Sequence, residues 1–212
     1  GRTRADILAQ AAGLAALPLD MAEWRADFYE DVLDLNKTLD TLKALRAVKD
    51  RFGDVTVILS ENSGSLDTRF GKAQDFRREM EDISGKPLID SLTAAEPIGP
   101  RKLLDALVIC PCTGNTLGKL SNGVTDSTVA LAAKAHLRND RPVVVAVATN
   151  DGLSAAARNI GELLVRKNIF FVPFGQDDPE KKPCSLMADF TRIGETVDAA
   201  LEGRQLQPVL RR

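Results

Sequence analysis

The strongest constraint on the fold is a series of four apolar runs that alternate with helical patterns from residue 54 onward. Each run is continuously apolar, which is typical of strands covered on both faces. The runs lie at residues 54–60, 105–111, 142–149 and 169–174. The helical patterns lie at residues 72–83, 114–121, 126–138, 153–167 and 185–201. This alternation implies right-handed crossovers, so the sequence predicts a three-layer α/β/α domain with a mostly parallel sheet.

The first quarter of the chain has a different pattern. Apolar side chains recur at steps of three or four over residues 22–51, which predicts a helix that ends near Gly53. No β-branched run precedes Asp54, so no first strand is visible before that helix. Residues 1–20 are interpreted as a separate short helix or an extension. We therefore divide the chain into a helical N-terminal extension, 1–35, and an α/β domain, 36–212.

Composition excludes several classes of function. The 212 residues carry a formal net charge of −2, so no overall attraction to nucleic acid or membrane is expected. No apolar run approaches the roughly 20 residues of a transmembrane helix, and the start lacks the pattern of a signal peptide, which favours a cytoplasmic protein. Three cysteines without framework spacing argue against a disulfide scaffold, and one histidine, His136, leaves no evident metal site.

Polar loops follow all four predicted strands. In open parallel sheets, ligands bind beyond the carboxyl ends of the strands. The four loops read "SENSGS", "CPCTGNT", "TNDG" and "FGQDDP", and all are rich in Ser, Thr, Asn, Asp or Gly. Any one of them alone is explained somewhat better as a turn or a helix cap than as a ligand site. Four such loops at one sheet edge favour a ligand site.

The loop "TGNT" has the most specific chemistry. Thr113, Asn115 and Thr116 present donors and acceptors at a predicted helix N-terminus, where unpaired N–H groups favour electron-rich partners. Gly114 allows close approach to the backbone. Asp126 begins the next helix, as an N-cap or as a ligand-fixing residue.

Basic side chains near two loops suit a carboxylate-bearing substrate, with solvated surface charge as the alternative. These residues are Arg69, Lys72, Lys181 and Lys182. The sequence contains no Ser–His–Asp arrangement that His136 could complete, no P-loop motif and no G-x-G-x-x-G motif. A bound cofactor would supply chemistry that these side chains lack.

Long stretches between residues 36 and 210 match a known family in order. They include "DTRFGKAQDFRREMEDISGKPLI", "AEPIGPRKLLDALVICPCTGNTLGKLSNGVTDS", "LRNDRPVVVAVATND" and "KNIFFVPFGQDDPEKKPCSLMADF". On these stretches the chain resembles the B subunits of dipicolinate synthase. That family looks like a branch of the Rossmann-like flavoprotein fold family, which includes homo-oligomeric flavin-containing cysteine decarboxylases.

The resemblance implies a site for flavin mononucleotide (FMN). In the wider family, a loop that matches Pro111, Thr113, Asn115 and Thr116 contacts the flavin, and an acidic residue matches Asp126. We assign Asn115 the catalytic role. The expected cofactor-binding residues, from this loop and its neighbours, are Ser60, Thr113, Gly114, Asn115, Thr116, Asp126, Ser127, Thr149 and Asn150.

The resemblance also implies an activity and partners. Together with a dehydrogenase-like A subunit, the chain would oxidise a dihydrodipicolinate-level precursor to pyridine-2,6-dicarboxylate in the mother cell during sporulation. A flavin, or NAD(P) through the A subunit, would accept the hydride, and a homo-oligomer is expected. Two alternatives remain open: a non-catalytic partner of the A subunit that has lost its cofactor, and a flavin-dependent decarboxylase of small acids. No histidine matches the one that the decarboxylases use, which argues against peptidyl-cysteine decarboxylation.

One departure from the family predicts a structural anomaly. The family opens with a strand and a Thr-Gly-Ser-type loop that reaches the flavin phosphate, whereas this chain has a helical, acidic pattern there. Family strand order places that first strand inside the sheet. Its absence predicts a gap, unless the flanking strands pair differently or the extension adopts β structure against its pattern.

Overall fold

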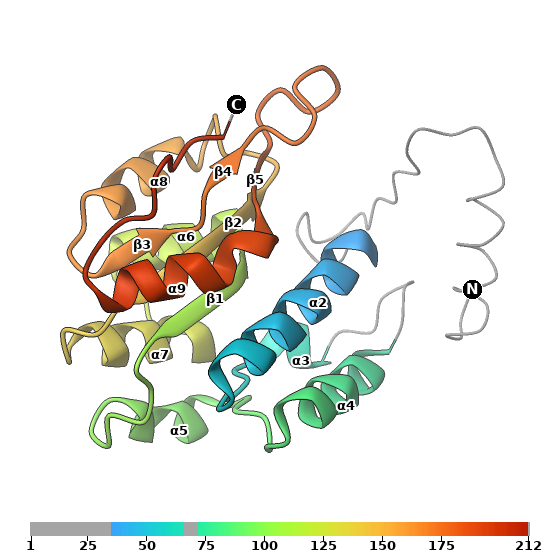
Figure 1. The fold of residues 1–212 in the computed structure, drawn as a ribbon, viewed down its shortest axis with the longest axis vertical. Coiled ribbons are helices and arrows are strands. Elements are labelled where there is room, and N and C mark those ends of the chain that lie inside the picture. Colours follow the sequence, from blue (N-terminus) through green and yellow to red (C-terminus); the bar gives the residue numbers. More distant parts are fainter. Residues whose placement is uncertain (1–34, 66–71, 212) are drawn as a thin grey trace, which may run out of the picture.

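A parallel three-stranded core forms the centre of the protein, which we describe from a computed structural model covering residues 35–65 and 72–211 (Figure 1). Strand β2 (Val143–Thr149) lies between β1 (Leu107–Cys112) and β3 (Ile169–Phe171), and both pairings are parallel. The apolar runs predicted as the second, third and fourth strands are therefore confirmed as the sheet's core.

Two short strands extend the sheet, and the first of them in the strand order, β5 (Leu186–Ala188), runs opposite to β2. Strand β5 pairs antiparallel with the end of β2 and with β4 (Phe174–Gly175). The helix predicted over residues 185–201 is thus wrong in its first part. Because β2 continues past the end of β3, its last backbone groups need another partner, which β5 provides. A 3₁₀ turn, η2 (Phe190–Arg192), follows, and the helix α9 occupies only Ile193–Leu201.

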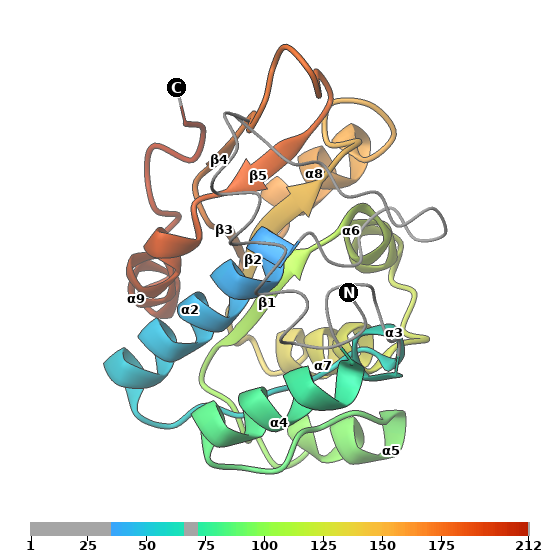
Figure 2. The same cartoon turned by 90° about the vertical axis from the view of Figure 1, so that its right-hand side faces the viewer.

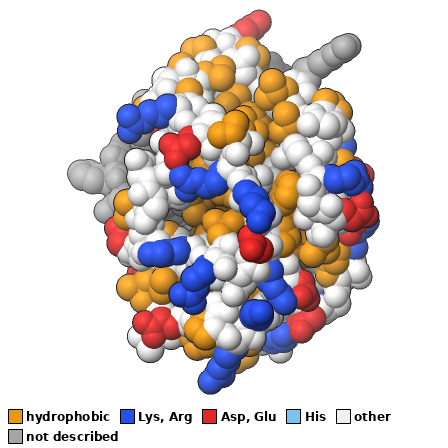
Figure 3. Space-filling model, turned by 90° about the vertical axis from the view of Figure 1, so that its left-hand side faces the viewer, with side chains coloured by type: hydrophobic (Ala, Val, Ile, Leu, Met, Phe, Trp, Pro, Cys, Tyr) orange, Lys and Arg blue, Asp and Glu red, His pale blue; other side chains and the backbone are white. Residues whose placement is uncertain are grey.

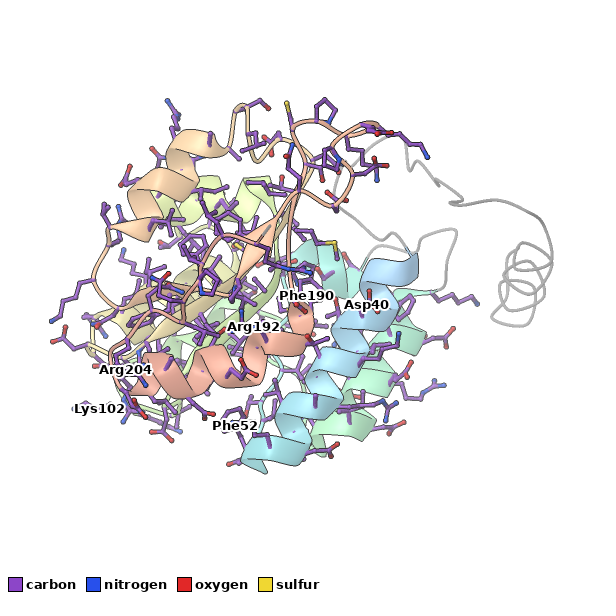
Figure 4. All side chains as sticks on the ribbon, turned by 45° about the horizontal axis from the view of Figure 1, so that its top comes forward. Asp40, Phe52, Lys102, Phe190, Arg192 and Arg204 are labelled. Carbon is purple, nitrogen blue, oxygen red and sulfur yellow. The ribbon has the colours of Figure 1, made fainter. Side chains whose placement is uncertain are left out.

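Helices cover both faces of the sheet and confirm the three-layer prediction. Figure 2 shows α6 (Gly114–Asn122), α7 (Thr128–Leu137) and α8 (Ala157–Leu164) on one face. On the other face lie α9 and α2 (Leu35–Phe52). Figure 4 shows α2 beside η2 and the start of α9, with Asp40 near Phe190 and Arg192.

Helix α8 is shorter than its predicted span of 153–167. The residues after β2 form turns instead, closed by the backbone N–H groups of Ser154 and Ala156, which both donate to the Asp151 carbonyl. Residues 89–105 contain two short helices, α5 (Leu92–Ala95) and η1 (Glu96–Ile98).

Helix α2 confirms part of the helix predicted over residues 22–51. It ends at Gly53, whose φ of 75° suits glycine. The rest of that prediction, and the helix or extension predicted over residues 1–20, lie outside the described residues. Helices α3 (Glu61–Ser65) and α4 (Ala73–Ser84) follow α2, and α2 packs on α4 and α9.

The first predicted strand, residues 54–60, does not join the sheet. Its segment is extended but forms only an isolated bridge, in which Leu59 N–H donates to the Ile89 carbonyl at 2.8 Å and Ile89 N–H donates to the Val57 carbonyl at 2.9 Å. Strand β1 stands at one end of the strand order, so no strand among the described residues pairs with its outer edge. The gap predicted inside the sheet stays a prediction.

Strand β2 is the centre of the apolar core. All seven of its residues are at most 2% exposed, and the surrounding helices contribute buried Leu117, Leu163 and Ile193. Each such large side chain stabilises the fold by roughly 1.5–3 kcal/mol relative to exposure. None of the described helices is long and apolar enough to cross a membrane. On the face shown in Figure 3, basic and acidic side chains are interspersed around apolar patches.

The buried histidine generates a prediction about pH. His136 is 1% exposed, and its Nε2 lies 3.1 Å from the Pro142 carbonyl oxygen. Burial lowers the pKa of His136 from its ordinary 6.5, so the unfolded chain binds the proton more tightly than the folded chain. The free energy of unfolding should fall as the pH drops below about 6.5, by no more than about 1.4 kcal/mol per pH unit from this group.

Urea unfolding of the wild type and of His136→Gln between pH 7.5 and 5.5 measures this contribution. The variant should lose less stability on acidification than the wild type, whatever its absolute stability. Equal losses in the two proteins would contradict the assignment.

Candidate functional site

A cavity of about 1200 Å³ runs along the outer edge of β1 and past its carboxyl end. Its walls come from α2, the extended segment 54–60, β1 and α9, and from the loops that follow the strands. All nine residues expected to bind the cofactor line this one cavity: Ser60, Thr113, Gly114, Asn115, Thr116, Asp126, Ser127, Thr149 and Asn150. The structure thus brings together residues that span ninety positions of sequence. The loops after β1 and β2 meet because the carboxyl ends of these strands lie side by side.

The loop after β1 begins helix α6. Thr113 is the N-cap, with extended backbone, and its Oγ1 accepts a hydrogen bond from the Thr116 N–H at 3.5 Å. Asn115, in the first turn, is exposed at the cavity wall. Helix α6 therefore directs its unpaired N-terminal N–H groups and the Asn115 carboxamide toward the same space.

Gly114 fixes the distance between this loop and the loop after β2. A Cβ at this position would lie 2.8 Å from Asp151 Oδ1 and 2.9 Å from Thr149 Oγ1. Thr149 Oγ1 donates to Asp151 Oδ1 at 2.5 Å, so these two side chains form one polar pair against the glycine. Gly114 is needed for packing of protein against protein here, in addition to any approach by a ligand.

The start of α7 differs from the prediction for Asp126. Ser127 is the N-cap, because its side chain accepts from the Ala130 N–H at 3.3 Å. Asp126 instead pairs with Lys119 Nζ at 2.8 Å. The hydrogen bond from Lys119 holds the pKa of Asp126 below its ordinary value. Lys119 was missed by sequence reasoning, although its position four residues after Asn115 places both on one face of α6.

Glu61 is a second residue that the sequence did not single out. Its Oε1 accepts hydrogen bonds from Thr128 Oγ1 at 3.0 Å and from the Thr128 N–H at 3.3 Å. Thr128 is fully buried at the start of α7. Glu61 therefore ties the start of α3 to the start of α7, next to Asp126. Only the fold brings these positions together, so the local sequence contains no signal for the contact.

The basic residues predicted to bind substrate do not converge on the cavity where they are described. Lys72 is the exposed N-cap of α4, and it is not part of the cavity lining. Lys181 and Lys182 lie in the loop after β4, where their backbone N–H groups donate to Asp178. Arg69 lies outside the described residues. Among the described residues that line the cavity, the cations are Lys86 and Lys119.

Cysteine and metal chemistry find little support in the described residues. Cys110 borders the cavity, but burial raises the pKa of its thiol to about 12, which keeps it neutral and weakly nucleophilic. The three cysteines are free. No group of His, Cys, Asp and Glu in the described ranges is arranged to hold a metal ion.

Comparisons with known proteins now place the chain. The family model described as Flavoprotein matches residues 34–201. The B subunit of dipicolinate synthase from Bacillus subtilis (strain 168) is 47% identical over 157 residues, which cover 74% of this chain and 78% of that protein. The chain belongs to the flavoprotein family, among the dipicolinate synthase B subunits.

Solved structures agree with this membership. The crystal structure of the dipicolinate synthase B subunit from Bacillus halodurans C is 40% identical, with a TM-score of 0.76, and the match covers 85% of this chain and 93% of that one. The structure of the FMN-dependent cysteine decarboxylase SpaF is 17% identical in sequence, with a TM-score of 0.53. The match covers 79% of this chain and 90% of that one, and at this identity it supports a shared fold and nothing more.

One short match points elsewhere. A stretch of 45 residues, 21% of this chain, is 51% identical to 3-dehydroquinate dehydratase of Clostridium botulinum (strain Eklund 17B / Type B). It covers 18% of that enzyme, which is too little to indicate its fold or activity in this chain.

The tight contact at Gly114 generates a prediction with a matched control. Gly114→Ala should lower the free energy of unfolding by about 1–3 kcal/mol, because the new methyl group overlaps Asp151 and Thr149. Gly118 lies in the same helix, and a Cβ there would meet only Asn159 Nδ2 at 3.6 Å. Gly118→Ala should therefore stabilise the protein by about 0.5–1 kcal/mol. Chemical unfolding measures both, and shifts of the same sign would contradict this account of the loop.

Proposed function

We propose that this chain binds FMN at the carboxyl end of β1 and β2 and acts with an A subunit to form dipicolinate from a dihydrodipicolinate-level precursor. The observation that carries the proposal is the convergence of Thr113, Asn115, Thr116 and Asp126 on one cavity. Membership among the dipicolinate synthase B subunits supports both the proposed substrate and the proposed pairing with an A subunit. The mother cell of a spore-former is the expected setting, and a homo-oligomer the expected assembly.

The ring half of a flavin fits the described residues. An isoalloxazine ring carries carbonyl oxygens, ring nitrogens and one N–H along its polar edge, so it needs donors and an acceptor close together. The α6 N-terminus offers backbone donors, and the exposed Asn115 carboxamide offers both a donor and an acceptor. Apolar residues that also line the cavity, such as Val129 and Pro111, suit the faces of the ring.

The phosphate half has fewer partners among the described residues. Lys119 is the cation nearest in sequence to the α6 N-terminus, and it already pairs with Asp126. The strand and loop that reach the phosphate in the family have no counterpart in the described ranges.

The proposed reaction removes two electrons and two protons from the dihydro ring as the ring becomes aromatic. Bound FMN would accept a hydride, and the second proton would pass to solvent or to a base. The residues of this chain would bind and orient the substrate. Lys119 suits a carboxylate partner because its ammonium borders the cavity with the side chain 24% exposed, while its present partner Asp126 is 62% exposed. A substrate carboxylate would replace Asp126 as that partner.

Asn115 tests flavin binding. Asn115→Ala should weaken FMN binding about tenfold, because the ring loses a donor and an acceptor. Asn122→Ala is the matched control, since Asn122 lies on the same helix but does not line the cavity. Quenching of FMN fluorescence during titration measures both affinities. An Asn115→Ala affinity equal to that of the wild type would remove Asn115 from the flavin site.

Lys119 tests substrate binding. With the A subunit present, Lys119→Gln should raise KM about tenfold with a smaller change in kcat, while Lys119→Arg should retain most of the affinity. Lys134→Gln, at an exposed position on α7 away from the cavity, is the control. An unchanged KM in Lys119→Gln would place the carboxylate elsewhere, including at the basic residues Arg69, Lys72, Lys181 and Lys182.

The same assays separate the alternatives. Protein that takes up no added FMN, yet raises the activity of the A subunit, would be a non-catalytic partner. Release of carbon dioxide from a small acid by the FMN-loaded chain alone would indicate a decarboxylase.

A further inference from the structure

The amino ends of the parallel strands meet at one face of the molecule, at the opposite end of the sheet from Asn115. Strands β1, β2 and β3 run in one direction and pair at their first residues, so the loops that precede them lie side by side. These loops are residues 99–106, 138–142 and 165–168, and the end of α9 with the turn after it, residues 201–205, lies at the same end (Figure 1, left). We call these four segments the amino-end face.

The amino-end face is rich in basic side chains, although the whole chain carries a formal net charge of −2. Figure 3 views this side of the molecule, and Figure 4 labels two of the basic residues there. The basic residues of the four segments are Arg101, Lys102, Arg138, Arg141, Arg166, Lys167 and Arg204. Four of them pair with carboxylates of the same face or of α8. The other three, Arg101, Lys102 and Arg138, are exposed, and no carboxylate in the described part of the chain pairs with them.

The turn that carries Arg101 and Lys102 is fixed to the rest of the fold. The Arg101 N–H donates to the Pro97 carbonyl at 3.0 Å. Asn139, just after α7, donates from Nδ2 to the Gly99 carbonyl at 2.8 Å. The backbone that presents the two cations is therefore already in place before a partner binds, which lowers the entropy cost of a contact with them.

Exposed apolar side chains lie on the same face as these cations. Leu103 is 53% exposed, Leu201 is 50% exposed and Val165 is 86% exposed. Helix C-termini attract cations, and α7, α8 and α9 all end here, so the positive charge alone has a local explanation. That explanation does not extend to large apolar side chains in water. Arginine together with exposed apolar side chains is typical of a surface that binds protein.

The charge of the amino-end face selects among partners. A second copy that docked through the same face by twofold symmetry would place cations against cations. A nucleic-acid backbone would meet the carboxylates of Asp105 and Asp140 on this face, and it has no apolar group for Val165. A protein surface that presents carboxylates around apolar side chains complements both the free cations and the apolar groups.

We propose that the amino-end face docks the A subunit, through a surface of that subunit that presents carboxylates around apolar side chains. This inference rests on the proposed pairing with an A subunit and adds the place where that subunit binds. Arg101, Lys102 and Arg138 would pair with the carboxylates, while Leu103 and Val165 would contact the apolar groups. A subunit docked at this end of the strands would leave the polar loops after β1 and β2 accessible to small molecules.

Charge reversal at Arg101 tests the docking face. Arg101→Glu should weaken binding of the purified A subunit about tenfold or more, with the largest loss at low salt, because a free cation becomes a repelling carboxylate. Arg78→Glu is the matched control, since Arg78 is an exposed cation of α4, outside the amino-end face. Calorimetric titration of the full chain with the A subunit, at low and at high salt, measures both. Equal affinities of the two variants would overturn the proposal.

Val165 tests the apolar part of the contact. Val165→Ser removes apolar surface but no charge, so it should weaken binding of the A subunit about threefold to tenfold and keep the salt dependence of the wild type. Because Val165 is almost fully exposed, the variant should unfold in urea as the wild type does. Wild-type affinity in Val165→Ser would remove apolar contact from the proposed docking.

Failure of this inference differs from failure of the proposed function. A chain that takes up no FMN but binds the A subunit through Arg101 would contradict the flavin site and support the docking face. A wild type that does not bind the A subunit at all would contradict both the pairing and the docking face. Loss of self-association in Arg101→Glu, measured by sedimentation, would overturn the inference by assigning the face to a second copy. Tighter binding of the wild type to duplex DNA than to the A subunit would overturn it as well.

Discussion

The structure depends on the complete burial of β2. Its residues are at most 2% exposed, and hydrogen bonds to β1, β3 and β5 occupy both of its edges. A strand without side-chain or backbone access to water must be surrounded by apolar layers, which explains why α7 and α9 both pack on it. The position of β2 also aligns its carboxyl end with that of β1. Because of that alignment, the polar loops that follow β1 and β2 lie close together in the candidate site.

The outer edge of β1 presents the opposite situation. Among the described residues the sheet ends at β1, the extended segment 54–60 remains separate from it, and a large cavity lies between the two. The loop with Thr113 and Asn115 lies at one end of this cavity. The candidate site and the outer edge of β1 therefore border the same cavity.

Sequence reasoning predicted the parts of the fold that local patterns determine. Continuous apolar runs identified β1, β2 and β3, and cap residues such as Thr113 identified the start of α6. The convergence of Thr113 with Thr149 was predictable because the ends of neighbouring parallel strands share one edge of the sheet. Strand β5 was missed because a three-residue strand has no period of its own and exists only where β2 needs a partner. Glu61 was missed because its contact with Thr128 crosses 67 positions.

The central claim is that the loop from Thr113 to Thr116 holds the ring of a flavin. A crystal structure of the full chain grown with saturating FMN tests it most directly. The account predicts isoalloxazine density with its polar edge within hydrogen-bonding distance of Asn115 and the α6 N-terminus. Density for the ring at any other place on the chain, with this loop left unoccupied, would contradict it.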